Sequence, residues 1–166
     1  MYEPERKRNP LVNSSAGARA LSATQLPVFL LRPPPGYGVL TTTGRTSGKP
    51  RRRCVRAIRS GDCAYVVAIK GSITGWLRNI RADPNVRLRI RGGTFSGVAR
   101  ELSEAEELRA AADAYCEPVG WFEYLEYGMW RRGRPTRAKI QQLHRAWCEQ
   151  GTPLVVELHG SGQGSS

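Results

Sequence analysis

The sequence predicts an α+β protein built on a mainly antiparallel β-barrel with flanking helices. Three observations lead to this fold class. Several β-rich runs are close enough to pair as hairpins, a short helical segment interrupts them, and further helical segments precede the last β-rich run. The 166 residues suit one domain. We predict a disordered N-terminus at 1–12, a single domain at 13–159 and a flexible Gly/Ser-rich tail at 160–166.

The first predicted element is a helix within residues 13–31, where large apolar side chains stand among small residues. We expect it to pack on the barrel. The alternative is an amphipathic segment that rests on a membrane surface beside Arg19 and Arg32. Three successive prolines then end the helix, because proline lacks an N–H and restricts the residue before it. The N-terminus has no apolar signal core, so we expect a cytoplasmic protein, with contact to the inner face of the plasma membrane as an option.

The β-rich runs come next and pair through short turns. Glycine-containing turns at 60–62 and 92–93 have the length that a hairpin needs. In 86–91, apolar residues alternate strictly with arginines, so one face is predicted to pack in the core and the other to face water. The predicted strands are residues 37–43, 52–59, 63–69, 86–91, 94–102 and 152–158.

Helices occupy the remaining segments. A short one at 74–82 is inserted between strands, and another runs from Ser103 to about residue 115, with Ser103 and Glu106 spaced as a capping box requires. An aromatic segment at 121–130 and a cationic turn precede a further helix at 138–149. Within that last helix, His144 stands next to an arginine, and we expect it to be solvated at the surface.

Composition limits the possible partners. The net charge is +12, from 26 Lys and Arg against 14 Asp and Glu, which suits nucleic acid, anionic lipid or a polyanionic cofactor. Nucleic acid ranks last, because the basic strands carry no aromatic residues on which bases could stack. Four cysteines without a C-x-x-C pair and only two histidines indicate reduced thiols and no metal site.

The loop that follows the first strand has the composition of an anion site. Gly44 and Gly48 allow a tight turn, and the residues around them supply hydroxyl groups and cationic side chains. Arginine binds two phosphate or carboxylate oxygens at once. The spacing is neither that of a nucleotide P-loop nor that of a dinucleotide fingerprint. A solvated hairpin turn is the alternative interpretation of this loop.

Several segments in order resemble the deazaflavin-dependent nitroreductase family of actinobacteria. They are VLTTTGRTSGKPR, SGDCAYVVAIKG, GWLRNIRADPNVRLRI followed by ARELSEAE, and TPLVVEL. The likeness covers about residues 10–118 and resumes at the last strand. It implies a split β-barrel related to flavin reductases and coenzyme F420, a deazaflavin hydride carrier, as cofactor, with flavin mononucleotide (FMN) as the alternative.

The resemblance also implies which residues contact this cofactor. The loop would hold its phosphate and polyglutamate tail, the turn after the third strand would pass close to its ring system, and the inserted helix would lie beside it. Two positions depart from the family pattern, since Thr46 replaces a frequent basic residue and Ile69 replaces a usual serine. Lys49 or Arg52 would compensate for the first. The implied cofactor residues are Arg45, Thr46, Ser47, Gly48, Lys49, Arg51, Arg53, Ile69, Lys70, Gly71, Trp76 and Asn79.

The implied reaction is hydride transfer from reduced F420 to a small-molecule acceptor, either a quinone, a nitroaromatic or an enone. Tyr124 and Tyr127 resemble family tyrosines that cover the substrate pocket and can protonate the acceptor, although aromatic packing on the barrel is an equal alternative. The segment 131–150 has no counterpart in the family pattern. A barrel that binds a cofactor or lipid-like ligand without turnover is the second functional hypothesis. The sequence favours no particular oligomeric state.

Overall fold

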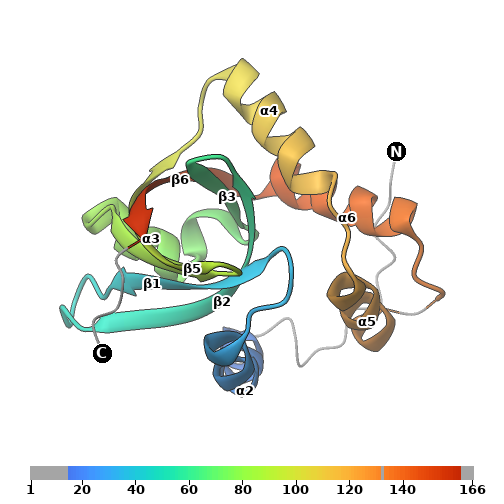
Figure 1. Cartoon of the computed structure of the whole chain (residues 1–166), viewed down its shortest axis with the longest axis horizontal. Helices are drawn as coiled ribbons and strands as arrows, with labels where there is room; N and C mark the ends of the chain where they lie inside the picture. The colour runs from blue at the N-terminus through green and yellow to red at the C-terminus, as the bar shows by residue number, and fades with distance from the viewer. Residues whose placement is uncertain (1–14, 132, 162–166) are drawn as a thin grey trace.

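Six strands form one closed barrel in which every neighbouring pair is antiparallel (Figure 1). The computed structural model describes residues 15–131 and 133–161. Around the barrel the strand order is β1-β2-β3-β6-β5-β4. The strands are β1 Tyr37–Thr43, β2 Pro50–Ser60, β3 Cys63–Ala68, β4 Asn85–Ile90, β5 Gly93–Glu101 and β6 Thr152–Ser161. The predicted α+β barrel is confirmed.

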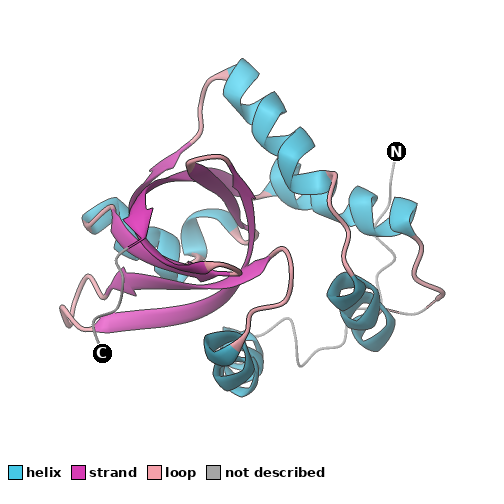
Figure 2. Ribbon diagram, in the orientation of Figure 1, coloured by secondary structure: helices cyan, strands magenta, loops and turns pink. Residues whose placement is uncertain are grey.

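Helices flank the barrel, and one of them lies at its end between β3 and β4 (Figure 2). In the described residues they are α2 Ser15–Leu31, the short 3-10 helix η1 Gly71–Ile73, α3 Gly75–Ala82, α4 Ala105–Cys116, α5 Trp121–Trp130 and α6 Arg137–Gln150. None of these helices combines the length and the apolar character needed to cross a membrane.

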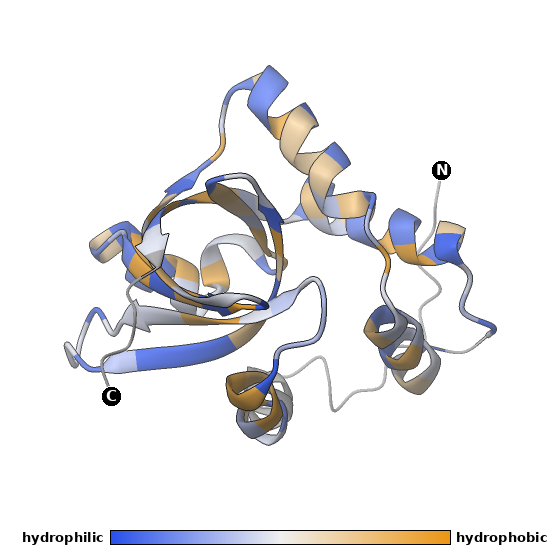
Figure 3. Cartoon of the chain, in the orientation of Figure 1, coloured by the Kyte–Doolittle hydropathy of each residue, from blue (hydrophilic) through white to orange (hydrophobic). Residues whose placement is uncertain are grey.

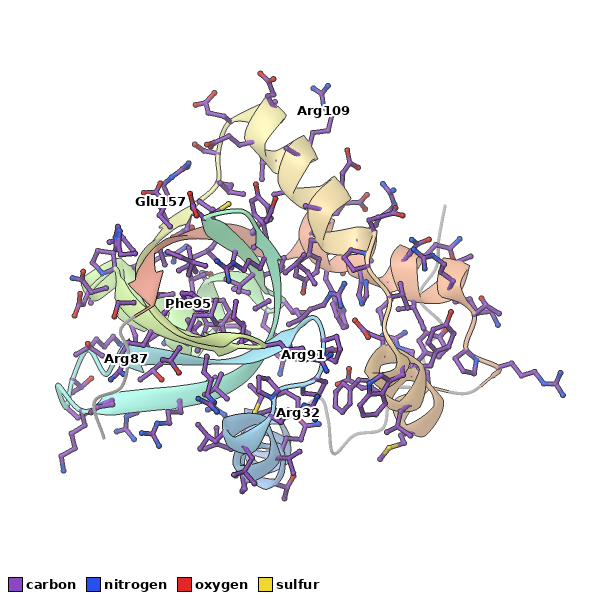
Figure 4. The ribbon with its side chains drawn as sticks, viewed as in Figure 1. Arg32, Arg87, Arg91, Phe95, Arg109 and Glu157 are labelled. Atoms are coloured by element: carbon purple, nitrogen blue, oxygen red, sulfur yellow. The ribbon has the colours of Figure 1, made fainter. Side chains whose placement is uncertain are left out.

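The core fills the barrel interior and continues under the helices. The predicted alternation in β4 is confirmed, because Val86, Leu88 and Ile90 are buried while the arginines between them lie on the other face. Phe95 of β5 projects into the same interior, and Arg87 points away from it (Figure 4). Apolar and polar residues both occur along the barrel strands, whereas the first half of β2 is hydrophilic (Figure 3).

Helix α2 packs on the outside of the barrel, as expected. Phe29 is buried against Tyr37 and Val39 of β1, and its ring meets that of Phe122 from α5 at a centroid distance of 5.6 Å. The predicted disordered segment 1–12 lies outside the described residues. Residues 160–161, expected in the flexible tail, instead continue β6, because His159 and Ser161 still pair with β5.

Two local predictions are wrong. The capping box at Ser103 is not formed: α4 begins one residue later than that motif requires, with Glu104 at the N-cap and no side-chain cap bond. His144 is not solvated but 1% exposed, between the rings of Tyr115 and Trp147. Burial, and secondarily the charge of Arg56, lowers the pKa of His144 to about 3, so the imidazole is neutral.

Candidate functional site

The β1–β2 connection, residues 44–49, is a tight loop held by its own backbone. The Gly44 N–H donates to the Lys49 carbonyl at 2.9 Å, and the Gly48 N–H donates to the Gly44 carbonyl at 2.7 Å. Gly48 has a φ of +65°, and a Cβ on Gly44 would lie 2.7 Å from the Ser47 hydroxyl oxygen. Both positions therefore favour glycine on steric grounds.

This loop offers cations and donors to solvent. Arg45, Lys49 and Arg51 are exposed, and no carboxylate in the described part of the chain pairs with them. Ser47 Oγ accepts from the Lys49 N–H at 3.3 Å and from Arg51 Nη2 at 3.4 Å. The charges are thus unneutralised and partly oriented, which fits a ligand with several anionic groups.

Strand register decides which arginines of β2 face the barrel interior. Val55 and Ala57 pack into the barrel core, so Arg51 and Arg53 share their face, and Arg53 is half-buried. Arg52 lies on the opposite face, together with Cys54, which packs against α2. Of the two residues proposed to compensate for Thr46, only Lys49 therefore belongs to the loop itself.

Helix α3 closes the barrel end next to this loop. Asn79 is 7% exposed, and its side chain donates to Thr42 Oγ1 at 3.0 Å and accepts from the Arg45 N–H at 3.3 Å. Trp76 is half-buried against the barrel core. Asn79 therefore ties the helix to the loop, a positioning contact that the sequence resemblance did not specify.

The turn after β3 lies at the same end of the barrel. Val66 pairs with Ala57 of β2, so β3 runs toward the start of β2 and the loop. Ile69 is 45% exposed, Lys70 is exposed, and Gly71 has a φ of +56°. The predicted cofactor residues, which come from the loop, the start of β2, the turn at 69–71 and α3, thus all lie toward the same end of the barrel.

The two predicted catalytic tyrosines lie elsewhere. Tyr124 and Tyr127 are half-buried on α5, which packs at the other end of the β1–β2 ladder, where Tyr37 pairs with Arg56. Six residue steps along β1 separate that pair from Thr43, which corresponds to roughly 20 Å along the strand. Figure 1 shows the same separation, with α5 and the tip of the β1–β2 hairpin on opposite sides of the barrel.

A buried ion pair that sequence reasoning missed fixes α5 on the barrel. Arg56 and Glu123 are in direct contact, with both side chains 3% exposed. Arg56 Nη2 also donates to the carbonyls of Tyr115 and Pro118, at 2.7 Å each. Glu123 Oε2 accepts from the Gly120 N–H at 2.9 Å. The available signal was an arginine between Cys54 and Ile58 on the outer face of β2 and a glutamate within an aromatic helix.

Glu126 adds a second carboxylate at this contact. Its Oε2 accepts a hydrogen bond from the Tyr37 hydroxyl at 2.7 Å. Burial raises the pKa of Glu126, and it raises the pKa of Tyr37 as well. Among the described residues, no group of three or more His, Cys, Asp or Glu side chains is placed to hold a metal ion.

Comparisons with known proteins bear on this arrangement. An F420H(2)-dependent quinone reductase of Mycobacterium tuberculosis (strain H37Rv) is 31% identical over 67 residues, which cover 39% of this chain and 45% of that protein. The counterpart from the CDC 1551 strain matches with the same figures. The match thus spans about half the length of these relatives.

Solved structures support the fold. The barrel is similar to that of a Bacteroides thetaiotaomicron protein assigned to 5-nitroimidazole antibiotic resistance, with a TM-score of 0.52 and 12% identity over 82% of this chain and 80% of that one. The fold is a split β-barrel. The sequence model named F420H(2)-dependent quinone reductase matches residues 31–132, which is more than half of the chain. The chain therefore belongs to the F420H(2)-dependent quinone reductase family.

Proposed function

We propose that this protein transfers a hydride from reduced coenzyme F420 to a quinone, with nitroaromatic compounds and activated enones as further acceptors. The observation that carries the proposal is the exposed, unneutralised cation group Arg45, Lys49 and Arg51 at the end of the barrel, in a member of this family. When bound, the reduced deazaflavin supplies the hydride, so the protein needs no nucleophile of its own.

The loop residues would bind the acidic tail of the cofactor. Arginine and lysine side chains neutralise its phosphate and carboxylates, and the exposed segment Thr46–Gly48 contributes hydroxyl and backbone donors. Arg53 lies further inside the barrel end, on the same face as Arg51. The fit between these donors and a polyanion is the reason for preferring F420 over FMN, which has one phosphate and no carboxylate tail.

The turn at 69–71 and Trp76 would orient the ring system. Ile69 is an exposed apolar side chain beside a glycine with positive φ, so the backbone can approach a planar ligand while Ile69 excludes water from one side. Asn79 positions the loop through Thr42 and Arg45 and acts on the cofactor through them. These contacts bind and orient the reactants without taking part in bond making.

Tyr124 and Tyr127 keep a proposed role in donating a proton to the reduced acceptor. That role requires the acceptor to lie between the loop end of the barrel and α5. Peripheral contact with the inner face of a membrane through the N-terminal segment is likewise proposed. It is supported by exposed apolar side chains on α2, since Val28 is 60% exposed and Leu31 is 82% exposed.

A side-by-side titration tests the proposal. The purified protein is titrated into F420 and into FMN while fluorescence is followed, and menadione is then added to the complex with reduced F420. We expect tighter binding of F420 than of FMN and oxidation of the reduced cofactor that depends on menadione. Binding without oxidation would support a ligand-binding barrel, and preference for FMN would overturn the cofactor assignment.

A further inference from the structure

Cys116 and Cys148, which are far apart in the sequence, lie in the same buried cluster between helices α4 and α6. Cys116 is the last residue of α4, and Cys148 lies in the last turns of α6. Cys116 is 1% exposed, whereas Cys148 is half-buried and packs against the same cluster of buried residues. No disulfide joins these thiols in the structure, so both are reduced.

Both cysteines belong to one cluster of packed side chains, at the contact between α4 and α6. The pKa of Cys116 is lowered, first because the Cys148 thiol donates a hydrogen bond to its sulfur and then because Arg145 and Arg56 favour the thiolate, while burial opposes the shift. The pKa of Cys148 is raised, because its proton is held in that hydrogen bond and because the group is partly buried. The cluster therefore places two reduced thiols side by side, and the half-buried Cys148 is the one that solvent reaches.

We propose that Cys116 and Cys148 form an oxidisable dithiol site, at which hydrogen peroxide or an organic hydroperoxide produces a disulfide that links α4 to α6. The half-buried Cys148 gives a small oxidant its access to the pair. Nothing in this site depends on the cofactor loop, which lies at the other end of the β1–β2 ladder.

The proposed reaction balances with peroxide as the only oxidant. The thiolate of one cysteine attacks a peroxide oxygen, the O–O bond breaks, and the leaving hydroxide (an alkoxide from an organic hydroperoxide) takes a proton, which leaves a sulfenic acid. The sulfur of the other cysteine then attacks the sulfenic sulfur, the S–O bond breaks, and the departing hydroxide takes the thiol proton to form water. Two thiols lose two electrons in total, and hydrogen peroxide is reduced to two waters or an organic hydroperoxide to an alcohol and one water.

The position of the pair gives oxidation a structural consequence. Cys116 follows Tyr115, and the carbonyls of Tyr115 and Pro118 both accept hydrogen bonds from Arg56, the residue that fixes α5 through Glu123. A covalent link between residues 116 and 148 would restrain the segment that forms these contacts. It would also restrict the conformations of the unfolded chain, so we expect the unfolding temperature to rise.

Peptide mapping of the full chain tests the site directly. The protein is treated with hydrogen peroxide without reducing agent, alkylated, and digested with trypsin, which places the four cysteines in the separate peptides 54–56, 60–70, 110–131 and 146–166. We expect peptides 110–131 and 146–166 to be joined, with a mass loss of about 2 Da that thiol reduction reverses. We also expect the unfolding midpoint of the oxidised protein to rise by about 5 °C.

Matched variants complete the test. Cys148→Ser should abolish the linked peptide, whereas Cys63→Ser, which removes a thiol that hydrogen-bonds to the Ser60 carbonyl at 3.2 Å, should retain it. The proposal would be overturned if Cys116 and Cys148 of the wild-type protein could still be alkylated at peroxide levels that oxidise Cys63. A disulfide between a different pair of cysteines would also overturn it. Because the wild-type map needs no variant and no cofactor, this outcome is distinct from a failure of the proposed hydride transfer.

Discussion

At the scale of single residues, Arg51 and Arg52 are a matched pair. They are adjacent and exposed, but Arg51 lies on the barrel face of β2 with Ser47 Oγ within 3.4 Å, while Arg52 lies on the other face. We expect Arg51→Ala to weaken F420 binding by about 1.5 to 3 kcal/mol, as for the loss of a charged hydrogen bond. A fluorescence titration measures the change. Arg52→Ala serves as the control and should cost clearly less, and equal losses in both variants would argue against this placement of the tail.

The buried Arg56–Glu123 pair predicts a large effect on stability. Arg56→Ala leaves the Glu123 carboxylate buried without its partner, so we expect the free energy of unfolding to fall by about 3 to 5 kcal/mol. Urea denaturation followed by circular dichroism measures this difference. Arg81→Ala breaks an exposed pair with Glu101 and should change stability little. A loss for Arg56→Ala as small as that for Arg81→Ala would show that α5 does not depend on this contact.

His144 predicts a pH dependence. Its pKa is about 3 in the fold and near 6.5 in the unfolded chain, so only the unfolded chain takes up the proton as pH falls below 6.5. The contribution of His144 to stability should be constant well above that value and decrease by about 2 kcal/mol from pH 7 to pH 5. Urea midpoints of wild type and His144→Gln measure the effect as a difference, because Glu126, with its raised pKa, contributes the opposite slope in both proteins. Parallel pH profiles would contradict the assignment.

At the scale of elements, close approach between strands explains one glycine. A Cβ on Gly38 of β1 would lie 2.5 Å from the Arg89 carbonyl oxygen of β4, whereas one on Gly128 of α5 would meet nothing within 4 Å. We expect Gly38→Ala to destabilise the protein by about 1 to 3 kcal/mol through steric strain. Gly128→Ala should stabilise it by up to about 1 kcal/mol through helix propensity. Thermal unfolding of both variants gives the signs, and the same sign for both would contradict this account.

Element prediction from sequence succeeded where the pattern is local. The alternation in β4 and the glycine turns at 60–62 and 92–93 predicted the correct hairpins, because side-chain period and turn geometry are set by near neighbours. Boundaries were less accurate. β2 begins at Pro50 rather than at residue 52, because pairing with Thr43 extends the ladder beyond the strand-forming residues. The start of α4 was misplaced because Ser103 lies outside this helix, which begins at Ala105 and packs through Leu108 and Ala111 near Val155 of β6.

At the scale of the whole molecule, the residues proposed to bind the cofactor and the two tyrosines lie at opposite ends of the β1–β2 ladder. If Tyr127 acts on the acceptor, Tyr127→Phe should lower the rate of menadione reduction by about tenfold or more and leave F420 affinity unchanged. Steady-state kinetics and the titration measure the two effects separately. An unchanged rate would assign Tyr127 to the packing of α5, and a change in affinity alone would place the cofactor itself against that helix.

The sequence by itself determined the α+β barrel, the strand order along the chain and the cationic, glycine-containing character of the loop, since periodicity, turn residues and local charge encode these features. Only the tertiary structure decided that Arg51 and not Arg52 faces the barrel, that His144 and Arg56 are buried, and that Cys116 meets Cys148. Such contacts join residues that are far apart in the chain, and they depend on strand register and on how the helices pack. No local pattern specifies them, because burial of a polar side chain depends on the partner that the folded chain brings to it.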